Sequence, residues 1–394
     1  MHLLSKTWPA GVVDRSNPNP KWALSLDALV LVVGLGLFNC FALFLASQHQ
    51  LLDFSSMYTG GSLVVAGRGA LLFDIQTQIE FQHRVLGMKG LLAYNHLAFE
   101  SLLFAPLALL PFQVALWAWR ILSIAMLAYS ARTLAGVYRC ARWHALWIAV
   151  AFFPVVAAIV QGQDSILLLS LLAGTLQLLA ADSDRSAGCL LALALFKPQL
   201  ILPMAAMLVL KRGWRFLLGF LAGSATVLMV STAITGFGGW RRMFELWRYA
   251  ASGAGSQIGV NAVSMPNLRG ILWLMGLAPH AAFVVALGLS AVLFAAVAWR
   301  LRTCRSVERL FPPLVALALL LSPHVNAHDL AILILPIVAL LVANKRSLAL
   351  CAGACFCMPL FLLLGHVALY FFVICAVLFV ALREPAHLQL QPAE

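Results

Sequence analysis

Long apolar runs separated by short polar segments make up most of the chain. The first run extends from Trp22 to Ser47, which is long enough to cross a bilayer once. Similar runs recur to residue 382, and the pattern predicts an all-α polytopic membrane protein with one membrane domain over 1–394. We divide it into a first span at 22–47, an extracytoplasmic loop at 48–96, central helices at 97–235, a second extracytoplasmic segment at 236–278 and C-terminal helices at 279–382.

The loop at 48–96 contains two amphipathic stretches, near 56–67 and 74–87, which we expect to form helices on the membrane surface. The apolar stretch that follows is broken at Pro106 and Pro111. It is longer than one span requires, so we predict one full crossing and one short or re-entrant helix before residue 132.

Residues 187–210 have the length of one span, yet polar, basic segments flank them on both sides. The break at Lys197-Pro198 resolves this conflict, because proline ends a helix. We therefore predict a hairpin of two half-length helices with Lys197 at its tip. The remaining spans are expected at 143–160, 165–181, 214–235, 280–299, 310–322, 330–343, 347–364 and 366–382, with a further helix at 267–277.

Composition agrees with the pattern, since 63% of the 394 residues are hydrophobic, 10% are charged and the mean hydropathy is +0.95. These values exclude a soluble globular class. The net charge of +12 is explained by Lys and Arg in cytoplasmic loops and not by nucleic-acid binding. Acidic lipid head groups are a compatible partner. The excess of Lys and Arg in cytoplasmic loops also predicts that both termini lie in the cytoplasm. We expect the protein in the cell membrane (the inner or plasma membrane).

The acidic residues are the most informative polar positions, because there are only 14 of them. Seven are predicted to fall on the outer side, where amides and histidines also flank the spans. This one-sided distribution is expected of a protein that performs chemistry on one membrane face. The seven are Asp53, Asp74, Glu80, Glu100, Asp164, Glu245 and Asp329.

Lys197 is the most unusual single residue, since an amine in hydrocarbon costs roughly 3 kcal/mol or more unless it is paired or reaches water. A phosphate anion of a substrate would hold it charged. The alternative is a structural ion pair with Asp164 or Asp329.

The stretch QGQD, which contains Gln161, Gln163 and Asp164, precedes a span. These side chains could cap the helix, or they could bind the hydroxyl groups of a sugar-like substrate.

In SPHVNAHD, His324 and His328 are four residues apart and could share a metal on one helix face. Pro323 and Asn326 favour a turn instead, so capping, hydrogen-bonding and substrate contacts are preferred. The outer acids could bind a divalent cation, but no tight ligand cluster stands out, and we predict neither a metal site nor a required cofactor.

Asp53 follows the first span directly, and an acid in that place is often only the solvated start of a loop. Phe54 and Tyr58 could anchor the segment at the interface, while Gly60 and Gly61 permit close packing. A carboxylate held there could accept a proton from a hydroxyl group.

Taken in order, these motifs resemble glycosyltransferase family 87 over roughly residues 50–345. They are Asp-Phe-x-x-x-Tyr in the first loop, QGQ, Lys-Pro-Gln followed by KRGWR, and a late Ser-Pro-His. The chain departs from the family in having Met57-Tyr58 in place of paired tyrosines. It also reads AYNHLAFESLLFAP where a Tyr-Pro-Pro element is usual, which bears on sugar and acceptor identity.

The resemblance implies a GT-C-type bundle of roughly ten to thirteen helices, with an active site open to the outer face. It implies a hexosyltransferase, several relatives being α-mannosyltransferases, which uses a polyprenyl-phosphate-sugar donor and a glycan or glycolipid acceptor. Asp53 matches the catalytic base. We expect substrate or phosphate contacts from Lys197, Tyr58, Gln161, Gln163, Asp164, Asn261, Arg269, His324 and His328, with Arg241 as a further cation.

Two other classes of function stay open. A lipid or lipid-linked-sugar flippase would place its site near mid-membrane between broken helices of two related halves, whereas this chain has one broken pair and a one-sided polar surface. A non-catalytic relative that binds a lipid-linked glycan would share the motifs and tolerate loss of the acid.

Overall fold

A computed structural model describes residues 34, 36–39, 52–140, 142–251, 264–343 and 348–383. Within these ranges every regular element is a helix, which confirms the all-α polytopic membrane fold. Among the described residues, three helices are long and apolar enough to cross a membrane: α5 (Phe112–Val137), α11 (Trp214–Ala251) and α13 (Pro279–Arg300). The predicted first span at 22–47 lies almost wholly outside the described residues.

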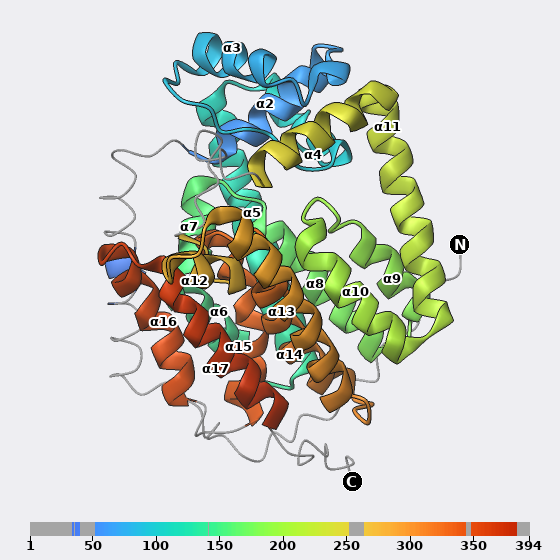
Figure 1. Cartoon of the computed structure of the whole chain (residues 1–394), viewed down its shortest axis with the longest axis vertical. Coiled ribbons are helices and arrows are strands. Elements are labelled where there is room, and N and C mark those ends of the chain that lie inside the picture. Colours follow the sequence, from blue (N-terminus) through green and yellow to red (C-terminus); the bar gives the residue numbers. More distant parts are fainter. Residues whose placement is uncertain are drawn as a thin grey trace.

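Shorter apolar helices complete the bundle shown in Figure 1. Most side chains of α14 (Val307–Leu321) are buried, so this helix runs through the core. The others are α6 (Arg142–Ala151), α7 (Phe153–Gln161), α8 (Ser165–Ala180), α9 (Asp184–Ala192), α10 (Pro198–Arg212), α12 (Leu268–Leu274), α15 (Ile334–Ala343), α16 (Leu348–Leu363) and α17 (Tyr370–Arg383).

A layer of short helices covers one end of this bundle (Figure 1). Its main elements are α2 (Phe54–Val65) and α3 (Ile75–Leu86), which are the two helices predicted for the first loop. Asp74 begins α3 by accepting a hydrogen bond from the Thr77 N–H at 2.8 Å, and Gly87 ends it in the left-handed conformation. We call this layer, residues 52–110, the cap.

The second half of the cap confirms the predicted break at the two prolines. It contains η2 (Ala98–Glu100), α4 (Ser101–Phe104) and η3 (Leu107–Leu109), and α5, which follows, is long enough for one full crossing. Gly61 lets α2 approach α4 closely, because a Cβ there would lie 2.6 Å from the Phe104 carbonyl oxygen.

Phe54 and Tyr58 do not anchor the cap at the interface as predicted. Both are buried in a small core of their own with Phe104 and Trp119. The Tyr58 hydroxyl donates to the Leu110 carbonyl at 2.8 Å, so its role here is to hold the cap together.

The span predicted over 143–160 is not one continuous helix. The structure has two helices there, α6 and α7, separated at Phe152, whose backbone is extended. Pro154 gives the reason, because it lacks the N–H that a continuous helix would donate to the Val150 carbonyl.

The second outer segment also differs from the prediction, since α11 continues past residue 235. It bends at Gly236, where φ is +65°, and its second arm runs to Ala251 beside the cap (Figure 1). The helix expected at 267–277 is present as α12, and α13 begins where predicted.

The hairpin predicted around Lys197-Pro198 is confirmed. Helices α9 and α10 are joined by a turn at 193–197, and Pro198 takes the first helical position of α10. The hairpin is held against α11 by small residues: a Cβ at Gly219 would lie 2.0 Å from the Arg185 carbonyl oxygen, and one at Gly188 would lie 2.3 Å from that of Phe216. The two backbones therefore touch, as in other membrane helix pairs with small residues at the contact.

This contact yields a test of the packing. We expect Gly219→Ala to destabilise the protein by about 1–3 kcal/mol, because α9 must move away from α11. The matched control is Gly288→Ala in α13, where an added Cβ meets no atom within 4 Å. Thermal unfolding in detergent measures both, and equal midpoints for the two variants would contradict the close contact.

Candidate active site

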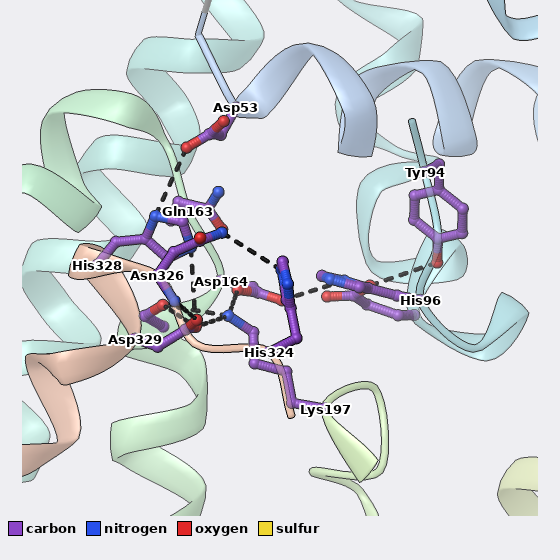
Figure 2. A network of polar contacts seen from close by, with 12 residues as sticks. Asp53, Tyr94, His96, Gln163, Asp164, Lys197, His324, Asn326, His328 and Asp329 are labelled. Carbon is purple, nitrogen blue, oxygen red and sulfur yellow. Dashed lines mark hydrogen bonds and ion pairs between the residues drawn. The ribbon is translucent and has the colours of Figure 1, made fainter. Parts of the chain in front are cut away.

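A pocket of about 440 Å³ lies between the cap and the bundle. Segments that are far apart in the sequence form its wall, and most of them meet at the starts of helices (Figure 2). The polar and aromatic lining residues are Asp53, Ser56, Asn95, His96, Gln163, Phe196, Lys197, Gln199, Trp247, Arg269, Phe283, His324, Asn326, His328 and Asp329.

Lys197 lies at the centre of the polar network in Figure 2. Its Nζ is 2.7 Å from Asp164 Oδ1 and 3.3 Å from Ser165 Oγ, and it also donates to Asp329 Oδ1. The three ionised residues are each at most 3% exposed. The structure therefore realises the ion-pair alternative for Lys197, with both candidate acids at once.

Asp164 precedes α8 but does not cap it, since its side chain accepts no hydrogen bond from the first turn. The carboxylate instead faces Lys197 on one side and His96 on the other, where Oδ2 is 3.2 Å from His96 Nδ1. The capping interpretation of QGQD is thus wrong for Asp164, whose carboxylate forms an ion pair with Lys197 instead.

The SPHVNAHD stretch forms the turn that its proline and asparagine favour. Ser322 Oγ donates to the His324 carbonyl at 2.7 Å, and Asn326 and Asp329 form a capping box at the start of η6 (Ala327–Leu333). His324 and His328 consequently do not share a helix face. Burial lowers the pKa of His324 to about 4, so at neutral pH this side chain is uncharged.

Asp53 lies at the edge of the pocket, at the N-terminus of α2. Its carboxylate makes no capping bond and its side chain is 23% exposed, unlike the buried acids around Lys197. Oδ2 is 3.6 Å from His328 Nδ1, and His328 Nε2 is 3.7 Å from Asp329 Oδ1. A partly exposed carboxylate beside a histidine is arranged to receive a proton from a bound molecule.

His96, Asn95 and Trp247 are pocket residues that the sequence interpretation missed. Two buried glutamines of α3 hold the segment that carries the first two. Gln82 exchanges hydrogen bonds with the backbone of Leu92 at 2.8 and 3.0 Å, and Gln78 accepts from the Tyr94 N–H at 2.7 Å. Trp247 Nε1 then donates to the Asn95 carbonyl at 2.9 Å. The available signal was the pair of glutamines four apart on one helix face.

Arg269 lines the pocket next to the 322–329 turn. It is the second residue of α12, where Asn267 caps the helix and also donates to the Ser322 carbonyl at 2.8 Å. The Arg269 guanidinium lies 5.3 Å from the Phe283 ring and donates to the Pro323 carbonyl at 3.3 Å. This cation is buried to 3% exposure and faces the pocket.

Several other candidates lie elsewhere. Tyr58 and Gln161 do not line the pocket, and Asn261 is outside the described residues. Arg241 is 84% exposed and pairs with Glu245 on the surface. Of the seven acids predicted outside, the structure gathers Asp53, Glu100, Asp164 and Asp329 around this site, whereas Asp74, Glu80 and Glu245 do not join it.

Comparison with protein families decides the class. The profile of glycosyltransferase family 87 matches residues 98–323, which is more than half of the chain. The chain belongs to glycosyltransferase family 87. It is therefore a membrane glycosyltransferase, which uses a sugar donor and an acceptor. Neither the curated proteins nor the solved structures contain a match to this chain.

The matched residues of this family 87 member include much of the pocket. Asp164, Lys197 and Arg269 lie within the match, whereas Asp53, His324 and His328 lie outside its limits. The family match thus covers the Lys197–Asp164 ion pair, whereas Asp329 of the second pair and Asp53 lie outside it and join the pocket by geometry alone.

The network around Lys197 makes a stability prediction. Removing the ammonium with Lys197→Met leaves Asp164 and Asp329 buried without a cation, so we expect a loss of about 3–5 kcal/mol. Lys89→Met is the control, because Lys89 is exposed on the cap. The measurement is thermal unfolding of the purified enzyme, and a Lys197→Met midpoint equal to that of the control would refute the assigned role.

Proposed function

We propose that this enzyme transfers a hexose, with mannose as the first candidate, from a polyprenyl-phosphate-sugar donor to a hydroxyl group of a glycan or lipid acceptor. The transfer inverts the anomeric carbon and takes place on the extracytoplasmic face. One observation carries the proposal: Asp53 presents a partly exposed carboxylate to a pocket whose other acids are tied to Lys197 or buried.

In the proposed step, Asp53 accepts the proton of the acceptor hydroxyl, while the oxygen of that hydroxyl forms a bond to the anomeric carbon of the donor sugar. The bond between that carbon and the phosphate oxygen breaks, and its electron pair leaves with the polyprenyl phosphate. His328, 3.6 Å from the Asp53 carboxylate, is placed to hold it in position.

Arg269 is the proposed partner of the donor phosphate. A guanidinium suits phosphate because it can donate two parallel hydrogen bonds. Lys197 was expected in this role, but two carboxylates already offset its charge, so we assign it to the framework of the site. His324 lines the pocket as an uncharged hydrogen-bonding group.

The proposed outer location of the pocket is supported by the direction of α8 and α10. Both helices start at the pocket, at Asp164 and Lys197. Both end at a polar, basic region where Arg212 pairs with Asp182 and Asp184. With 16 residues, α8 is about 24 Å long, close to the roughly 30 Å of hydrocarbon in a bilayer. The pocket and the basic region thus suit opposite membrane faces.

Asp53→Asn tests the base directly. We expect it to lower sugar transfer from a radiolabelled polyprenyl-phosphate sugar by about 100-fold or more. The unfolding midpoint should stay near that of the wild type, because the Asp53 carboxylate makes no capping bond.

The control is Asp74→Asn, which makes the same change at a helix start of the same cap, where asparagine can still cap α3. This variant should retain full transfer. Full transfer by Asp53→Asn would refute the base assignment. A wild-type protein that moves the donor across liposomes but transfers sugar from no such donor would refute the reaction and favour a flippase.

A further inference from the structure

A second cluster of ionisable side chains begins at the pocket wall with His96, which lies on the far side of Asp164 from Asp53 (Figure 2). It consists of His96 from the cap segment, Glu100 from η2 and Asp164 from the start of α8. His96 Nδ1 is 2.7 Å from Glu100 Oε2 and 3.2 Å from Asp164 Oδ2. The proposed transfer reaction uses none of these three groups as base or phosphate partner.

Negative charge exceeds positive charge in this buried region. Glu100, Asp164 and Asp329 are each at most 2% exposed, and Lys197 pairs with the second and third of them. Within the described part of the chain, the only ion pair recorded for Glu100 is the one to His96. A buried carboxylate is costly unless a proton or a cation compensates it, so the cluster lacks positive charge.

The Glu100 side chain gives independent evidence for a ligand. Its Oε1 is buried, and no amide, hydroxyl or cationic group of the described residues donates a hydrogen bond to it. The Glu100 carboxyl also lies against that of Asp164. Two carboxylates in contact do not both stay ionised without a cation between or beside them.

The distances match those around a metal ion. Three potential ligand atoms, one from each residue, lie within 4.8 Å of one another. Ligand atoms bound at about 2.1 Å in octahedral geometry are about 3 Å apart, and the two measured separations from His96 Nδ1 bracket that value. One imidazole nitrogen with two carboxylate oxygens suits Mn²⁺ or Zn²⁺ better than Ca²⁺.

We propose that His96, Glu100 and Asp164 bind one divalent transition-metal cation, Mn²⁺ or Zn²⁺. The ion would supply the charge that the cluster lacks and would tie the cap, through His96 and Glu100, to the start of α8. Water would complete its coordination. The proposal is independent of the sugar-transfer reaction, because metal content and unfolding can be measured without any substrate.

The test uses the full-length protein, purified in detergent and treated with a chelator. Binding of Mn²⁺ and of Zn²⁺ is measured by calorimetry and by metal analysis after dialysis. We expect one tightly bound cation per chain in the wild type, with an unfolding midpoint that rises as the metal is added. Glu100→Gln should weaken binding by at least about tenfold and abolish the rise.

Glu245→Gln is the matched control, because Glu245 is a half-exposed acid paired on the surface. It should bind metal like the wild type. His96→Gln provides a second variant whose side chain is partly exposed, and in Mn²⁺-loaded wild type a nitrogen coupling in pulsed electron paramagnetic resonance should disappear on this change. No bound metal in the wild type, or equal affinity in Glu100→Gln and Glu245→Gln, would overturn the proposal.

Discussion

The site depends on one buried cation. Lys197 stands at the tip of a helical hairpin, where hydrocarbon or dry protein would expel an ammonium group unless acids surround it. Asp164 and Asp329 surround it, and they come from the starts of two other helical segments. Because a charged triad of this kind is stable only when all three groups meet, it fixes three separate chain turns relative to each other. The pocket wall is built on those turns.

The cap completes the site without entering the triad. The cap is held in place by side-chain hydrogen bonds to the backbone. Gln78 and Gln82 bond to the segment before Asn95, and Trp247, from the second arm of α11, donates to the Asn95 carbonyl. Tyr58 and the aromatic core around it keep α2 in place, so that Asp53 begins that helix at the pocket edge. A partly exposed acid on a rigid support is what a proton acceptor requires, since packing restricts its position while water and substrate can reach it.

The ionisable groups of this site have different roles. Those at the centre balance one another, and their burial makes each one costly to change. Asp53 is partly exposed at the pocket edge, where a hydroxyl group of the proposed acceptor could meet it, and the buried Arg269 lines the same pocket, where a phosphate could meet it. The cluster of His96, Glu100 and Asp164 is connected to the triad, since Asp164 belongs to both the triad and the proposed cation site. A charge change at Asp164 would thus affect framework and cluster together.

The sequence by itself determined the membrane class, the hairpin at Lys197-Pro198, the helices of the cap and the concentration of acids near the span ends. These features follow from apolar length, from proline's missing N–H and from the cost of charge in lipid, all of which act locally. The ordered motifs also led to the family, which the profile match confirms.

Only the tertiary structure decided which acids meet Lys197, that Asp164 forgoes capping α8, and that His96 and Trp247 belong to the pocket. It also turned Phe54 and Tyr58 inward and extended α11 past Gly236. The physical reason is shared by all of these. A side chain's partner depends on long-range packing between distant segments, whereas residue spacing reports only on neighbours along the same helix.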